Sequence, residues 1–363
     1  MVNPTVGVEE EFLLVDPESG EPVPVNRVVA QEAKTRGVDL QLELTSCQVE
    51  TTSDVADTSD ELRSDLTRMR SIAAESASAC GARLLAVGLP PSVPHQFPIT
   101  DTPRYSKIAD SFGMIAHEQG ICGCHVHVAV PDRGAAIHVS NWLRPWLPLL
   151  VALSANSAIY RGAESGYASW RSILWARWPS AGPPPYFESV DDYDATVDML
   201  MDTGAILDDG MVYWDVRPSS QFPTIEVRGA DVPLTVSETV LLATLIRAAV
   251  MTALDELESG LPPVRVAAET LRAAYWKAAR EGLSGSAIDL AGGCRSAPTR
   301  RLLEGFVTRI GPALDRLGEH SHVRDELNRI VVAGNGAMRQ IRAWRRRGEI
   351  SDVIGEVAEA TLS

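Results

Sequence analysis

The sequence has few cysteines, no long apolar run and no basic leader, and each shortage excludes a class of protein. Its cysteines are odd in number and lack the spacing of a disulfide framework, which predicts a reducing cytosol. The longest apolar run, residues 147–155, is far shorter than the roughly 20 residues that span a bilayer. No basic segment followed by an apolar one opens the chain, so we expect no secretory signal, no membrane segment and a cytoplasmic protein. The five cysteines are Cys47, Cys80, Cys122, Cys124 and Cys294.

Positive charge is also scarce. There are 33 Lys and Arg against 48 Asp and Glu, a formal net charge of −15. Because a protein that binds nucleic acid generally needs clustered cations, we expect no nucleic-acid partner. The chain has no G-x-x-x-x-G-K-[ST] phosphate loop, no G-x-S-x-G nucleophile elbow and no H-E-x-x-H motif. What is present is a folded chain: 363 residues, 45% of them hydrophobic, enough for one large domain or two average ones.

Strand-like segments of period two are separated by helical stretches. Strands are expected at residues 5–15, 39–51, 83–88 and 122–130, with two more in 212–232. Helices are expected at 57–80, at 135–157 with interruptions at Pro145 and Pro148, and at 235–257, 264–282, 299–317, 323–334 and 350–361. No linker divides the chain, so we expect a single α+β domain over 1–363, strand-rich to about 233 and helical from about 234.

Three of these strands place a polar pair opposite an apolar face. The first strand places Glu9 and Glu11 on the face opposite Val6, Val8, Glu10, Phe12 and Leu14. His125 and His127 in the fourth strand, and Glu226 and Arg228 in the last, alternate with apolar residues. An isolated E-x-E is more often a solvated strand face. One sheet with an apolar back and a charged front explains all three pairs together.

A front face of this composition suits a hard divalent cation such as magnesium or manganese, because buried like charges need neutralising. Glu43 and Glu50 are weaker candidates, since residues seven apart share a strand face only if a bulge or turn intervenes. The competing hypothesis is structural zinc at Cys122, Cys124, His125 and His127. Four ligands in one straight row cannot close a tetrahedron without another element. The remaining histidines, His95, His117, His138, His320 and His322, are expected to be ordinary surface or core residues.

Four segments in order, from residue 6 to about 360, resemble the type 2 glutamate–cysteine ligases, also called YbdK-like carboxylate–amine ligases. These segments are Gly7-Val8-Glu9-Glu10-Glu11-Phe12, Cys122-Gly123-Cys124-His125-Val126-His127-Val128, Leu153-Ser154-Ala155-Asn156-Ser157 running to Gly166-Tyr167-Ala168-Ser169-Trp170-Arg171, and Arg217-Pro218-Ser219 through Pro223-Thr224-Ile225-Glu226-Val227-Arg228. The resemblance implies a glutamine-synthetase-like domain whose curved, mainly antiparallel sheet holds ATP and divalent ions. It also favours a homodimer.

The same resemblance implies roles for individual residues. Arg228 would stabilise the transferred phosphoryl group and, with Arg217, bind the nucleotide, while His127, Tyr167 and Arg171 would line the amino-acid side of the pocket. The metal ligands implied are Glu9, Glu11, Glu43, Glu50, His125 and Glu226, the last also counted as catalytic.

The implied reaction joins a carboxylate, typically the γ-carboxylate of glutamate, to an amine, typically that of cysteine, through an acyl phosphate made from ATP. Departures from the family pattern gather around the expected acceptor pocket. They are Ala158-Ile159-Tyr160, Glu164-Ser165 and Gly229-Ala230. Two other hypotheses stay open: a metal-dependent hydrolase of amides or phosphoesters on the same fold, and a non-catalytic acidic binding protein.

Overall fold

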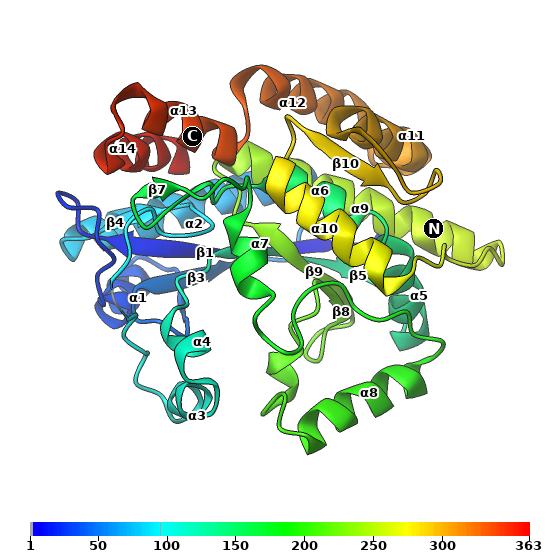
Figure 1. Ribbon diagram of the computed structural model, residues 1–363, viewed down its shortest axis with the longest axis horizontal. Coiled ribbons are helices and arrows are strands. Elements are labelled where there is room, and N and C mark those ends of the chain that lie inside the picture. Colours follow the sequence, from blue (N-terminus) through cyan, green and yellow to red (C-terminus); the bar gives the residue numbers. More distant parts are fainter. Residues whose placement is uncertain (1–2, 95) are drawn as a thin grey trace.

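The computed structural model describes residues 3–94 and 96–363, and a seven-stranded sheet lies at its centre (Figure 1). The strand order is β2-β3-β1-β5-β9-β8, with β4 pairing beside β1, and every pairing in this sheet is antiparallel. The strands are β1 (Val6–Val15), β2 (Gln41–Leu42), β3 (Gln48–Thr52), β4 (Arg83–Leu85), β5 (Gly123–Ala129), β8 (Val216–Pro218) and β9 (Thr224–Asp231). The expected α+β class with a mainly antiparallel sheet is confirmed.

The register aligns the polar pairs found in the sequence. Glu9 lies opposite His125, Glu11 lies opposite Glu50, and His127 lies opposite Glu226. The apolar residues between them pack on the other side of the sheet in the main hydrophobic core. A charged front and an apolar back therefore follow from strand alternation.

Two long helices, α2 (Ser59–Ala79) and α9 (Val236–Glu258), cover the back of the sheet. Helix α2 begins with a capping box, in which Thr58 accepts from the backbone N–H of Glu61 and the Glu61 side chain reaches back. At the start of α9, Thr235 likewise accepts from Glu238 N, but the Glu238 carboxylate pairs with Arg329, so only half of a capping box forms there.

Shorter elements surround the front of the sheet. A second hydrophobic cluster, which includes Ile108, Trp178 and Trp214, holds them together. Figure 1 shows α3, α4 and α8 below the sheet and α7 in front of it. These helices are α3 (Pro103–Phe112), α4 (Met114–His117), α7 (Trp170–Trp175) and α8 (Val190–Asp202).

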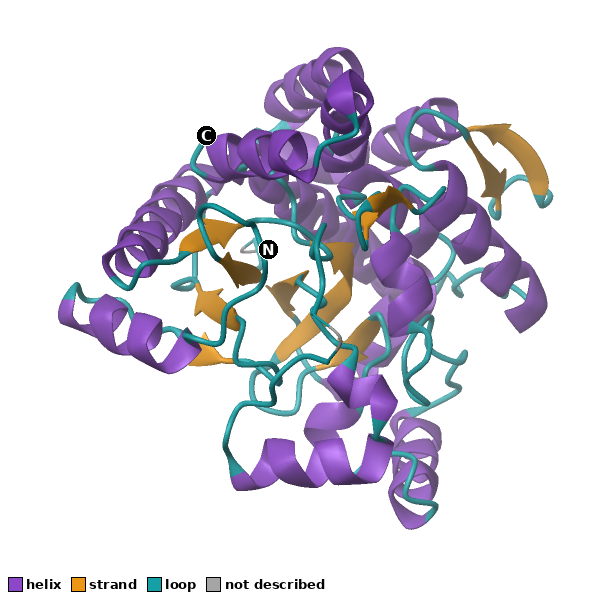
Figure 2. Ribbon diagram, turned by 60° about the vertical axis from the view of Figure 1, so that its left-hand side comes forward, coloured by secondary structure: helices purple, strands orange, loops and turns teal. Residues whose placement is uncertain are grey.

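Most of the last third of the chain lies above the sheet in Figure 1, and Figure 2 shows the strands enclosed by helices on several sides. It consists of α10 (Ala268–Glu281), α11 (Thr299–Leu317), α12 (His320–Ala333), α13 (Gly336–Arg347) and α14 (Ile350–Thr361), with a hairpin of β10 (Ser286–Asp289) and β11 (Arg295–Pro298). The division into a strand-rich and a helical part is only approximate, because this hairpin lies in the last third and many helices lie before residue 234.

Some expected boundaries differ from the structure. The segment expected as one strand over 39–51 is two strands, β2 and β3, joined by a turn that supplies the change of direction Glu43 and Glu50 need. The chain breaks between α5 (Arg133–Leu143) and α6 (Leu147–Ser154), at Pro145, whereas Pro148 sits in the first turn of α6, where proline is tolerated. The other elements are α1 (Asn26–Thr35), β6 (Ile159–Tyr160), β7 (Ala163–Glu164) and the short 3₁₀ helix η1 (Asp209–Met211). Among the described residues, no helix has the length and apolar character needed to cross a membrane.

Candidate active site

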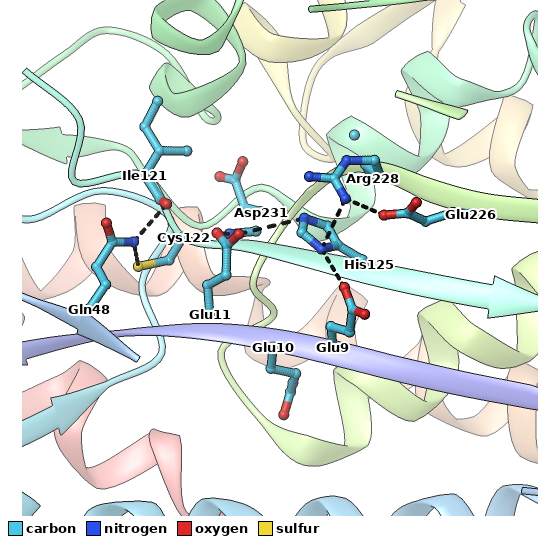
Figure 3. Close-up of polar contacts among 12 residues, drawn as sticks. Glu9, Glu10, Glu11, Gln48, Ile121, Cys122, His125, Glu226, Arg228 and Asp231 are labelled. Atoms are coloured by element: carbon cyan, nitrogen blue, oxygen red, sulfur yellow. Dashed lines mark hydrogen bonds and ion pairs between the residues drawn. The ribbon is translucent and has the colours of Figure 1, made fainter. Parts of the chain in front are cut away.

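A cavity of about 310 Å³ opens on the front of the sheet and collects almost all of the residues singled out in the sequence. Neighbouring strands supply most of them, because every second residue of β1, β3, β5 and β9 faces this side. Figure 3 shows Glu9 and Glu11 on one side of β1 and Glu10 pointing away from them. The predicted residues that line the cavity are Glu9, Glu11, Glu43, Glu50, His125, His127, Arg171, Arg217, Glu226 and Arg228.

Glu9, His125 and Glu226 form the first group that could hold a metal ion, with one donor atom from each within 4.8 Å of the others. Glu9 Oε2 lies 3.0 Å from His125 Nδ1, and Glu9 Oε1 lies 3.4 Å from Nε2 of His127. Burial acts to raise the pKa of Glu9, but the two imidazoles outweigh it and hold the pKa far below its ordinary value. Glu9 is therefore an anion in a largely buried place.

Glu11, Glu50 and His125 form a second group of the same kind. Glu11 Oε2 accepts a 2.6 Å hydrogen bond from the backbone N–H of Gly123. Burial, helped by the negative charge of Glu11, raises the pKa of Glu43 to about 8. Burial, and next the charge of Glu43, raises the pKa of Glu50 well above its ordinary value. Such crowding of carboxyl groups is costly in isolation and favours a bound cation.

Two arginines converge on Glu226. Arg217 Nε donates to Glu226 Oε2 at 2.8 Å, and Arg228 Nη1 donates to Glu226 Oε1. Arg228 Nη1 also lies 3.4 Å from Nδ1 of His125, so one guanidinium borders the first metal group (Figure 3). Burial acts to raise the pKa of Glu226, yet the charges of Arg228 and Arg217 outweigh it and keep the pKa well below its ordinary value.

Arg171 reaches the cavity from α7, on another side. The residue is only 2% exposed, and its Nε has no hydrogen-bond partner within the described part of the chain. A buried N–H group without a protein partner beside a cavity is suited to an anionic or polar ligand.

Tyr167 lies apart from the other predicted residues. It lines a separate cavity of about 150 Å³ with Ala158, Glu164 and Arg345, and its hydroxyl accepts a 3.2 Å hydrogen bond from Trp276 Nε1. Two of the three departures from the family pattern, at Ala158 and Glu164, therefore line this second cavity. Only Gly229, whose carbonyl accepts from Arg171, borders the main site.

Glu164 pairs with Arg345 at 2.8 Å, and the other arginines of the Arg345-Arg346-Arg347 run pair with α14 residues. The run is the exposed C-terminal end of α13.

Some residues of the main cavity were not identified from the sequence. Gln48, Tyr105 and Phe222 are three of them, and each contributes to the wall of the cavity. Gln48 shares the front face of β3 with Glu50, so strand alternation could have found it. Tyr105 belongs to α3 and donates to Leu42 O at 2.8 Å, a contact that no local pattern encodes.

The structure separates the residues of the zinc hypothesis. Cys124 pairs with Glu10 in the register and is buried on the back of the sheet, whereas His125 and His127 face the front. A single ion cannot contact both faces. His95 lies outside the described residues.

Comparison with known proteins agrees with this geometry. The family model described as glutamate–cysteine ligase family 2 matches residues 5–356. A protein of Mycolicibacterium smegmatis named as a candidate glutamate–cysteine ligase 2-3 is 65% identical over 99% of both chains. One of Nocardia farcinica, named as a candidate glutamate–cysteine ligase 2-1, is 58% identical over 99% of this chain and 94% of its own.

Solved structures share the fold at low sequence identity. A glutamate–cysteine ligase of Francisella tularensis in complex with AMP has a TM-score of 0.72 at 14% identity, covering 100% of this chain and 90% of that one. A bifunctional glutathione synthetase of Pasteurella multocida has a TM-score of 0.70 at 13% identity, covering 99% of this chain and 52% of that one. From the family match, the close relatives and the shared fold, the chain belongs to glutamate–cysteine ligase family 2 and is an ATP-dependent ligase.

Proposed function

We propose that the protein joins the γ-carboxylate of L-glutamate to the amine of L-cysteine, with ATP converted to ADP and phosphate through an acyl phosphate. The observation that carries this proposal is the front cavity, in which buried carboxylates and imidazoles lie beside four arginines. The names of the close relatives and of the Francisella structure support the choice of substrates. Cysteine is the default amine.

The residues of the two metal groups fit a hard divalent cation. Carboxylate oxygens dominate both groups, and the raised pKa values of Glu43 and Glu50 come from burial and from mutual repulsion that a cation would relieve. Glu9 and Glu226 would hold one ion and Glu11 and Glu50 another, and the neutral imidazole of His125 would complete the ligand set of one of the two. Bound Mg²⁺, or Mn²⁺ in its place, would supply charge neutralisation for the phosphates of ATP.

An apolar cavity of about 200 Å³ adjoins the first metal group and suits the adenine ring of ATP. It shares Glu9 and His127 with the site, and its wall includes Val55 and Phe222. Both of these side chains are large, apolar and more than half exposed, 75% and 54% respectively. A base placed here would direct the triphosphate along the sheet toward Arg228.

The chain's own groups then have separate tasks. Arg228 is largely buried and its pKa is raised, because Glu226 outweighs the effect of burial, so it stays charged and offsets charge on the transferred phosphoryl oxygens. Arg171 would bind a carboxylate of the amino acid through its free Nε. Exclusion of water from the cavity once the substrates fill it would protect the acyl phosphate from hydrolysis before the amine attacks.

Phosphate release should be measured with purified protein, ATP and Mg²⁺ across amino acids and amines, with product masses recorded. We expect phosphate release that needs both glutamate and an amine. The mass of the product should equal that of glutamate plus the amine minus one water. Product formed without nucleotide would favour a hydrolase. Absence of ATP–Mg²⁺ binding by calorimetry would favour a non-catalytic binding protein.

A further inference from the structure

Asp231 ends β9, the strand that carries Glu226 and Arg228, but it is not among the residues that line the main cavity. The side chain is 1% exposed. Its Oδ2 accepts hydrogen bonds from Asn156 N at 2.8 Å and from Ser157 Oγ at 2.7 Å, and Oδ1 accepts one from Ser169 Oγ at 2.8 Å. A buried carboxylate thus binds both ends of the segment that runs from residue 156 to residue 169.

The two serine hydroxyls pass this constraint on to α7. Each donates its proton to Asp231, so its oxygen is left to accept. Ser157 Oγ accepts from the backbone N–H of Arg171 at 3.0 Å, and Ser169 Oγ caps α7 by accepting from Ser172 N at 3.2 Å. The backbone that carries Arg171 is therefore attached to β9 through one carboxylate.

Two glycines leave room for this arrangement. A Cβ at Gly88 would lie 2.9 Å from the Asp231 carboxyl, and a Cβ at Gly123 would lie 2.4 Å from Arg171 Nη2. Arg171 passes over Gly123 into the cavity. Its Nη1 lies 3.9 Å from Asp231 Oδ1, which supplies an opposite charge to a buried cation.

We propose that Asp231 is the positioning residue that holds Arg171 in the orientation in which it receives the amino-acid substrate, an inference that rests on the proposed function. Asp231 touches no substrate. It acts through Ser157, Ser169 and the Arg171 guanidinium, and it fixes Arg171 relative to the strand that bears Glu226 and Arg228.

The first test needs no turnover. Hydrogen exchange of the Asp231→Asn variant, read by mass spectrometry, should be at least tenfold faster in residues 156–172, because an amide cannot accept from donors on both sides. Glu238→Gln is the matched control, since it also removes a buried carboxylate, the one on α9 that pairs with Arg329 at 3.4 Å. It should leave exchange in 156–172 unchanged.

The second test is kinetic. Loss of a buried hydrogen bond to a charged group corresponds to about a ten- to hundredfold effect, so Asp231→Asn should raise KM for glutamate by about that factor while KM for ATP stays within about twofold. Ser157→Ala should change KM in the same direction by less. Glu238→Gln should leave both KM values unchanged.

Unaltered exchange in 156–172, or equal rises in both KM values, would overturn the proposal. If the wild-type protein forms no amide with any substrate pair, the proposed function fails. The exchange measurement by itself then decides whether Asp231 holds the Arg171 segment.

Discussion

Glu226 is the residue on which most of the front face converges, because two arginines donate to it and Nε2 of His127 lies 3.9 Å from Oε1. Replacing it with glutamine keeps the shape but removes a negative charge between Arg217 and Arg228. We expect kcat for amide formation to fall about 10²- to 10³-fold, the usual cost of removing one preorganised electrostatic group.

The rate of ATP-dependent phosphate release measures this effect, with Glu238→Gln as the control for loss of a buried carboxylate. A Glu226→Gln enzyme with wild-type turnover would remove Glu226 from both the metal site and the catalytic set.

Glu43 predicts a pH dependence of stability in the metal-free protein. Its folded pKa of about 8 exceeds the ordinary value of 4.5, so between these values the folded protein holds a proton that the unfolded chain has lost. Stability from this group is complete below pH 4.5 and is lost as pH rises toward 8. We expect the melting temperature of the wild type to fall across this interval more steeply than that of Glu43→Gln.

The lowered pKa values of Glu9 and Glu226 do not mask this slope. Their contributions are complete above the ordinary pKa of 4.5 and are lost only as pH falls below it. Calorimetry in a chelator at several pH values gives both curves. Parallel slopes for wild type and variant would contradict the assignment.

At the scale of elements, α2 depends on its N-terminal cap. Thr58→Ala removes the side-chain acceptor for Glu61 N, so we expect a loss of about 1 kcal/mol in unfolding free energy. Because the cap lies outside the cavity, turnover at a temperature well below melting should be unchanged. Chemical denaturation with a parallel activity assay checks both, and Thr58→Ser should restore most of the stability.

The sequence predicted the elements whose hydrophobic pattern is strong. β1 was expected at 5–15 and lies at Val6–Val15, and α11 has the expected bounds. The hairpin of β10 and β11 and the helix α8 were missed, because the hairpin is short and α8 is rich in aspartate. Strand alternation is a local property, whereas the packing of such pieces depends on residues far along the chain.

The candidate site divides in the same way. Alternation alone placed Glu9, Glu11, His125 and Glu226 on one face, but Glu43 and Glu50 needed the family resemblance, because a turn between two strands hides their relationship. Tyr167 was predicted beside the substrate, and the structure places it at the second cavity. Its role in substrate binding remains a prediction.

The whole molecule carries a formal charge of −15, and several of its carboxylates gather in the cavity on the front face of the sheet. Binding of Mg²⁺ only to the folded form should stabilise it, by about 2.7 kcal/mol at roughly 100 times the dissociation constant. Thermal melts with and without Mg²⁺ measure the effect, and Glu50→Gln should show a smaller gain. Equal gains would place the stabilising ion elsewhere.

The homodimer stays a prediction, which light scattering can test.

The three consecutive glutamates in β1 do not all face the same side of the sheet, and this difference specifies the register of the strand. Glu10 is fully buried on the back, where Arg70 of α2 and the hydroxyl of Thr239 on α9 bind its carboxylate. A slip of one residue in pairing would send Glu9 and Glu11 into the apolar layer and take Glu10 away from Arg70, at a cost of several kcal/mol. The contact between Glu10 and Arg70 thus specifies the register of β1. The same register places Glu9 and Glu11 on the front face, so stable folding and assembly of the active site depend on one contact.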